Sequence, residues 1–279
     1  MKKHSIFNPL FLAVAMLTRI PVRVGKVEPS DWKWCSALFS FCGIILGTVC
    51  MLPWAVLLLL KDLAVNKSWL YFDVPGYGIN LIGAFLFVAM LAWMTRIFHL
   101  DGFCDTCDSF SVVTEDPEKR LEIMKDPHPG AAAIFASGLL IIGKIILVFI
   151  LLQKCSAELE FRAVVFRGIP VLVLIPTAAR FAMVLLARIG NYARKDGTGA
   201  TVINGTTTLS VIIGILFLGP FFIFINPFAL TVVILGMVMT AVYWKIKATP
   251  LLGGITGDIL GACVETAEVM AALLLLLTI

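Results

Sequence analysis

Long apolar runs, separated by short polar segments, dominate the sequence beyond residue 35. A helix needs about 20 mainly apolar residues to cross the hydrocarbon layer of a membrane. Five runs reach about this length with at most two charged residues in each, and each of them predicts a transmembrane helix. These runs are residues 35–60, 74–95, 131–152, 168–187 and 259–279.

A sixth run, from Gly197 to Trp244, contains no charged residue and is long enough to cross twice. Asn226-Pro227 is the expected turn between the two crossings, which brings the total to about seven. The apolar segment from Phe7 to Ile20 is shorter, and we interpret it as an interfacial or re-entrant helix. The pattern thus predicts an all-α, polytopic membrane bundle, with residues 1–279 forming one domain.

Composition and charge favour a membrane protein and exclude other classes. Hydrophobic residues make up 60% of the chain and charged residues 14%, whereas soluble domains have about 45–50% and about 25%. The net charge of +4 provides no basic field of the kind that binds nucleic acids, so we expect no nucleic-acid partner. The seven cysteines are odd in number and lie mostly in or beside apolar runs, which argues against a disulfide framework.

The lysines and arginines predict the orientation of the bundle. If the N-terminus faces the cytoplasm, the segments on that side contain about three times as many of these residues as the opposite loops, as the positive-inside rule requires. The polar segments 96–130, 188–206 and 245–258 then all lie on the cytoplasmic side. We therefore expect the chemistry of the protein there.

The most distinctive polar segment contains Asp101, Asp105 and Asp108. Positions i, i+4 and i+7 share one face of a helix, and three carboxylates so close together repel one another unless a cation balances them. Mg²⁺ prefers one or two carboxylates together with substrate phosphate oxygens. The segment therefore predicts a Mg²⁺–diphosphate site, with a solvated helix face as the alternative. The nearby His99 is a candidate base or a hydrogen-bond partner for a carboxylate, or a plain interfacial histidine.

Cations follow this acidic segment. Asp116 and Pro117 predict the start of a short helix, which carries Arg120 and is followed by Lys125. These two cations could clamp the phosphates of a substrate. Alternatively, they only balance the charge of the acidic segment.

Two more polar loops are expected on the same side. One contains Arg194 and Lys195 between turn-forming residues, and the other leads into the last span. Either Thr256 or Asp258 could cap that last helix, so capping alone is one explanation for Asp258. Inside the predicted spans, charged residues are costly and usually face a partner or a wet cavity. For Glu265 and its neighbour at position 268, contact with water at the membrane surface is the alternative.

Five segments together resemble the cobalamin synthase family, the adenosylcobinamide-GDP ribazoletransferases. They are residues 18–22 (TRIPV), 99–108 (HLDGFCDTCD), 120–126 (RLEIMKD), 192–197 (YARKDG) and 256–262 (TGDILGA). They occur in this order over essentially the whole chain. Cys104 and Cys107 depart from the family pattern, because they replace small residues such as alanine. We give this isolated C-x-x-C no zinc or redox role.

The resemblance implies an enzyme of the inner membrane that acts late in cobalamin biosynthesis and depends on Mg²⁺. It would join adenosylcobinamide-GDP to α-ribazole or its 5′-phosphate and release GMP. The ligands of Mg²⁺ would come from Asp101, Asp105 and Asp108, and Asp108, His99 and Asp258 are the candidate catalytic residues. The candidate phosphate-binding residues are Arg120, Lys125, Arg194 and Lys195. A lipid bilayer surrounds such a bundle, and association into a homo-oligomer is left open.

Two other functions fit parts of the pattern. A CDP-alcohol phosphotransferase is also a multispan Mg²⁺ enzyme with an Asp-Gly-led acidic motif, but its aspartates are spread over a longer stretch than the eight residues used here. A secondary transporter would explain charges inside the spans. Transport sites gather near the middle of the membrane, however, whereas most polar residues of this chain are expected in the cytoplasmic loops.

Overall fold

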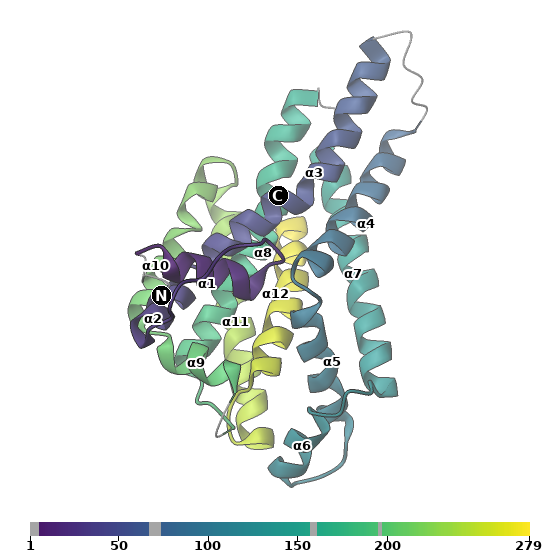
Figure 1. The fold of residues 1–279 in the computed structure, drawn as a ribbon. Coiled ribbons are helices and arrows are strands. Elements are labelled where there is room, and N and C mark those ends of the chain that lie inside the picture. The colour runs from purple at the N-terminus through teal and green to yellow at the C-terminus, as the bar shows by residue number, and fades with distance from the viewer. Residues whose placement is uncertain (1–5, 67–73, 157–160, 195–196) are drawn as a thin grey trace.

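The computed structural model describes residues 6–66, 74–156, 161–194 and 197–279, which fold almost entirely into helices (Figure 1). No β-strand is present among these residues. In chain order, the first six helices are α1 (Asn8–Leu17), α2 (Pro29–Ala37), α3 (Phe39–Asn66), α4 (Gly76–Met94), α5 (Phe98–Ser111) and α6 (Pro117–Ile123). They are followed by α7 (Ala131–Ser156), α8 (Phe161–Ile189), α9 (Thr198–Gly205), α10 (Thr208–Leu216), the 3₁₀ helix η1 (Gly219–Ile223), α11 (Pro227–Leu252) and α12 (Gly257–Thr278).

Six of these helices, α3, α4, α7, α8, α11 and α12, are long and apolar enough to cross a membrane. A seventh crossing is possible if the segments 199–205 and 208–223 act together, although they meet at 90°. The predicted helical membrane bundle is thereby confirmed. Helix α8 lies at the centre of the bundle, since 83% of its apolar segment is buried, against 22% of that of α7.

The structure differs from the prediction in the two places where a run contains a local stop. The run that begins at residue 35 is divided at Leu38, which separates α2 from α3. The first crossing after Gly197 is not straight, because α9 ends at Gly205 and Thr207 caps a new helix by accepting a hydrogen bond from the Ser210 amide. Apolar length predicts a crossing, but it does not reveal such a cap.

The N-terminal helix α1 has only ten residues and is too short to span a membrane. It packs mainly against α2 and lies across the direction of the long helices in Figure 1, where it is purple. This arrangement is compatible with an interfacial or re-entrant helix. Its depth in a membrane stays a prediction.

The three polar segments lie together at one end of the bundle. In Figure 1 this end contains α6 and the turn between α11 and α12. The backbone of Tyr192, in the second polar segment, forms a bridge with Ile255, in the third. This bridge brings residues that are far apart in the sequence to one place, while the predicted cytoplasmic location of the segments stays a prediction.

Candidate functional site

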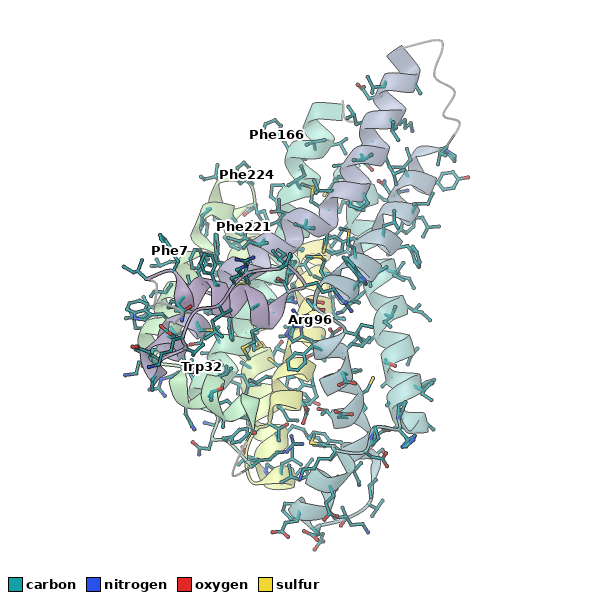
Figure 2. All side chains as sticks on the ribbon, in the orientation of Figure 1. Phe7, Trp32, Arg96, Phe166, Phe221 and Phe224 are labelled. Carbon is teal, nitrogen blue, oxygen red and sulfur yellow. The ribbon has the colours of Figure 1, made fainter. Side chains whose placement is uncertain are left out.

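The helix α5, which carries the three aspartates, begins at a sharp backbone break. Arg96 and Ile97 have φ values of 58° and 63°, a left-handed conformation that is uncommon for residues other than glycine. The N-terminal segment closes the end of α4 here, because the Arg19 amide donates to the Met94 carbonyl at 2.7 Å and Arg19 Nε donates to the Trp93 carbonyl at 2.5 Å. Figure 2 shows Arg96 at this junction. The break directs α5 toward the polar end.

Helix α5 packs against the start of α12 with almost no side chains between the two backbones. A Cβ atom on Gly102 would lie 2.8 Å from Asp258 Cα, and one on Gly261 would lie 2.8 Å from the His99 carbonyl oxygen. Both distances are shorter than real Cβ contacts. These glycines therefore let Asp258 approach the aspartate-bearing helix, although it is far away in the sequence.

Negative charge accumulates around Asp105 as a result. Partial burial, followed by the charges of Asp258 and Asp101, raises the pKa of Asp105 to about 7, although Arg194 acts in the opposite direction. Asp101 itself is exposed on the same face of α5. Three other aspartates but only one arginine thus contribute to the electrostatic environment of Asp105.

The last helix is capped by Thr256, not by Asp258. Thr256 Oγ1 accepts a hydrogen bond from the Ile259 amide at 3.3 Å. Asp258 Oδ2 instead accepts from Arg194 Nη2 at 2.9 Å and from Thr256 Oγ1 at 3.2 Å. The arginine and the aspartate are 21% and 23% exposed, so their ion pair borders solvent. Helix capping therefore does not explain Asp258, whose carboxylate is used in an ion pair at the polar end.

Asp108 connects the end of α5 to the start of α7. Its two carboxylate oxygens accept hydrogen bonds from the backbone amides of Gly130 at 2.6 Å and Ala133 at 2.9 Å. Backbone amides at a helix start have no partner inside the helix, so this interaction stabilises α7. The role of Asp108 as a metal ligand or base stays a prediction.

The predicted phosphate-binding cations lie in different environments. Arg120 is buried, and its guanidinium donates to the carbonyls of Ser109 at 2.5 Å and Thr114 at 2.7 Å. Because these bonds use the guanidinium to close the turn after α5, we leave Arg120 out of the proposed ligand set. Lys125 is exposed at the polar end. Lys195 lies outside the described residues.

A cavity of about 330 Å³ opens beside the aspartate face. One wall comes from α5 and includes Asp101 and Asp105, while the other comes from the connection between α6 and α7 and includes Lys125. In the part of the chain that the structure describes, no three His, Cys, Asp or Glu side chains form a ready-made metal site. Two carboxylates beside an open cavity nevertheless suit Mg²⁺, which takes its other ligands from water and substrate phosphates.

The two cysteines of α5 are free thiols. Cys104 lines the cavity, and burial raises its pKa. Burial also raises the pKa of Cys107 to about 11. Because the thiolate is the nucleophile and the metal ligand, this environment disfavours thiol chemistry at neutral pH.

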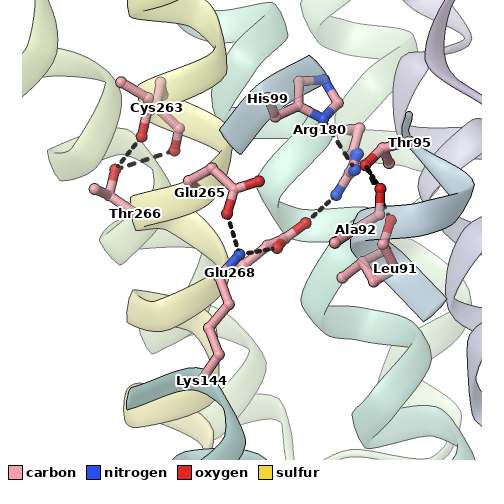
Figure 3. Close-up of polar contacts among 11 residues, drawn as sticks. Leu91, Ala92, Thr95, His99, Lys144, Arg180, Cys263, Glu265, Thr266 and Glu268 are labelled. Atoms are coloured by element: carbon pink, nitrogen blue, oxygen red, sulfur yellow. Dashed lines mark hydrogen bonds and ion pairs between the residues drawn. The ribbon is translucent and has the colours of Figure 1, made fainter. Parts of the chain in front are cut away.

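The charged residues inside the spans form a separate, buried network, shown in Figure 3. Lys144 Nζ lies 2.5 Å from Glu265 Oε2 and 2.5 Å from Glu268 Oε2, and Arg180 pairs with the other oxygen of Glu268. Glu265 is 7% exposed and Glu268 is 2% exposed. Contact with water does not account for these glutamates, because each one faces a buried cation.

His99 belongs to this network rather than to the cavity. Its side chain is buried, and Nδ1 lies 3.5 Å from Arg180 Nη2 (Figure 3). Burial and the positive charge of Arg180 lower the pKa of His99 to about 3. A neutral imidazole with this pKa is a weak base at neutral pH, so we do not place it among the catalytic residues.

Comparisons with known proteins cover almost the whole chain. A family model described as cobalamin-5-phosphate synthase matches residues 9–276. The adenosylcobinamide-GDP ribazoletransferase of Klebsiella pneumoniae is 31% identical, and the match covers 97% of this chain and 100% of the relative. Relatives of the same name from Syntrophobacter fumaroxidans and Lachnoclostridium phytofermentans are 31% and 28% identical, with at least nine-tenths of each chain covered. No solved structure matches the chain.

Proposed function

This chain belongs to the cobalamin-5-phosphate synthase family, and on this basis we propose that it is an adenosylcobinamide-GDP ribazoletransferase. It would join adenosylcobinamide-GDP to α-ribazole or its 5′-phosphate and release GMP. The observation that carries this proposal is the family match over residues 9–276. We propose that the reaction takes place in the cavity that Asp101 and Asp105 line.

The proposed reaction is a transfer at phosphorus. A hydroxyl oxygen of the ribazole sugar forms a bond to the phosphorus that remains on the corrinoid, and the bond from that phosphorus to the GMP oxygen breaks. The hydroxyl proton must pass to a base, and GMP leaves with the electron pair. Such transfers depend mainly on positioning and on spreading negative charge.

We propose that Asp101 and Asp105 hold Mg²⁺. Their carboxylates are hard oxygen ligands on adjacent turns of α5, and both border the cavity. A bound Mg²⁺ would offset the charge of the diphosphate as the bond to GMP breaks. The negative charge that surrounds Asp105, from Asp258 and Asp101, favours a divalent cation at this point.

The other polar residues have supporting roles in this proposal. Lys125, on the opposite wall of the cavity, is placed to bind a phosphate oxygen. Arg194 holds Asp258 and has a further nitrogen, Nε, that is buried without a partner among the described residues. Asp108 and Asp258 are the candidates to accept the hydroxyl proton. We further propose that the polar end faces the cytoplasm and that the protein lies in the inner membrane.

The test is an assay of the purified protein in lipid nanodiscs. Adenosylcobinamide-GDP and α-ribazole 5′-phosphate are added with Mg²⁺, and the release of GMP is followed by chromatography. Turnover should require both substrates and stop on chelation. Asp105→Asn should reduce it at least about 100-fold, whereas Glu122→Gln, an exposed carboxylate on α6, should not. Release of no GMP by the wild-type protein would overturn the proposed function.

A further inference from the structure

We propose that the cavity between α5 and the α6–α7 connection binds the guanine nucleotide and that Asp126 selects guanine over other bases. This inference rests on the proposed function, because it assigns the leaving nucleotide to the site described above. It adds a specificity residue on the wall opposite Asp101 and Asp105.

The layout of the cavity suits a nucleotide. Its volume of about 330 Å³ falls within the range of about 300–1,000 Å³ that is typical of small-molecule sites. Asp101 and Asp105 lie on the α5 wall, where a cation would hold phosphates. Lys125 and Asp126 lie on the other wall. A nucleotide in this cavity would therefore place its phosphates between the α5 wall and Lys125, and its base beside Asp126.

Between these charged groups, most of the lining is apolar. The apolar residues are Ile97, Leu100, Met124, Pro127 and Pro129. The aliphatic proline rings and the polarisable methionine sulfur provide apolar contacts for the faces of a purine ring. These residues provide contact area without selecting one purine over another, because every base has similar faces.

Asp126 can provide that selection. Its Oδ1 accepts a hydrogen bond from the His128 amide at 2.9 Å and lies 3.0 Å from His128 Nδ1. These interactions with His128 lower the pKa of Asp126, so the carboxylate stays ionised at neutral pH. No described residue donates a hydrogen bond to Oδ2. The carboxylate is 58% exposed, so a ligand can reach it.

An ionised carboxylate only accepts hydrogen bonds. Guanine presents two adjacent donors, N1–H and the 2-amino group, and one carboxylate can accept from both. Adenine presents an acceptor at N1, which a carboxylate repels. Xanthine presents an N1–H donor beside an oxygen acceptor, a pair that the side-chain amide of asparagine complements. Replacement of the carboxylate by an amide should therefore change the preferred base.

The experiment first measures equilibrium binding of GMP, AMP and XMP to the protein in nanodiscs with Mg²⁺. It then measures GMP release from adenosylcobinamide-GDP and α-ribazole 5′-phosphate. The wild-type protein should bind GMP more tightly than AMP or XMP. Asp126→Asn should weaken GMP binding about 10- to 100-fold and bind XMP more tightly than GMP. Glu122→Gln, on the exposed side of α6, is the matched carboxylate control and should keep the wild-type order.

The outcomes separate the inference from the function. If Asp126→Asn keeps the wild-type order of GMP over XMP, or if the wild-type protein binds no GMP, the assignment of Asp126 is overturned. If GMP binds as expected but no GMP is released from the two substrates, the base site stands and the proposed function fails. The gain of XMP binding shows that the variant is folded, because an unfolded protein gains no ligand.

Discussion

The acidic end and the buried network use the same kinds of side chain in opposite ways. In the network, Glu265 and Glu268 each lie beside a cation, and two carboxylates face two positive groups, Lys144 and Arg180. At the acidic end, the ion pair between Arg194 and Asp258 is the only one that a lysine or arginine forms near the aspartates of α5 among the described residues. Balanced charges hold helices together, whereas unbalanced charges are available for a cation and a substrate.

This contrast follows from the cost of desolvation. A charge inside an apolar bundle is stable only when a partner and good geometry offset the loss of water. A charge at the end of the bundle keeps part of its water, so it can exist without a partner. The same kind of carboxyl group thus supports the fold inside the bundle and, in the proposed function, binds a ligand at its end.

The largest expected effect comes from breaking the network. Glu268→Ala should lower the free energy of unfolding by about 3–5 kcal/mol, because it leaves Arg180 without its carboxylate and Lys144 with only one. Thermal unfolding in detergent, referred to Glu122→Ala as an exposed control, measures this. Equal stability of the two variants would show that the network does not support the bundle.

The next largest effect is expected where α5 packs closely against α12. Gly102→Ala should cost about 1–3 kcal/mol and reduce GMP release, because the added Cβ would meet Asp258 Cα at 2.8 Å and push α5 away from α12. Gly138→Ala, in α7, is the matched control, because its Cβ would meet nothing within 4 Å. If both variants behave alike, close packing at Gly102 is not needed for the site.

Much of this fold follows from the sequence. Apolar length predicted the spans, and Asn226 caps α11 where the turn was expected. The i, i+4, i+7 spacing placed the aspartates on one helix. Local stops were harder to recognise, because Thr207 starts a new helix inside an uncharged run.

The partners of individual charges could not be predicted. Lys144 and Glu265 are 121 positions apart, and no spacing rule connects residues on different helices. Nor does any sequence pattern show that Arg120 donates to backbone carbonyls at the end of α5. The same holds for the hydrogen bond from Arg19 to the last turn of α4. These contacts depend on tertiary packing, which a single sequence does not encode in local patterns.

Acidification should lower the stability gradually, by less per pH unit than Glu268→Ala does in one step. The lowered pKa of His99 means that the folded protein keeps the imidazole neutral while the unfolded chain binds a proton. The stabilising contribution is complete above pH 6.5 and falls as the pH drops from 6.5 toward 3, by at most about 1.4 kcal/mol per pH unit. His99→Gln should show a shallower loss of stability over this window. An unchanged slope would contradict burial of a neutral histidine.

The smallest effect on stability is expected at the acidic end. Asp101→Asn should change the free energy of unfolding of the metal-free protein by no more than about 0.5 kcal/mol, because the side chain is exposed and loses only repulsion from its neighbours. Chemical unfolding in a chelating buffer measures this. A loss comparable to that of Glu268→Ala would remove the distinction between the two regions.

The proposed function requires that carboxylates on α5 hold the cation that the reaction uses. Its most direct test is the Mg²⁺ concentration that gives half-maximal GMP release in the wild-type protein and in Asp101→Asn. Loss of one of two carboxylate ligands should raise this concentration about tenfold or more, while Glu122→Gln should leave it unchanged. If Asp101→Asn retained full turnover with the wild-type Mg²⁺ dependence, the cation would have to be bound elsewhere.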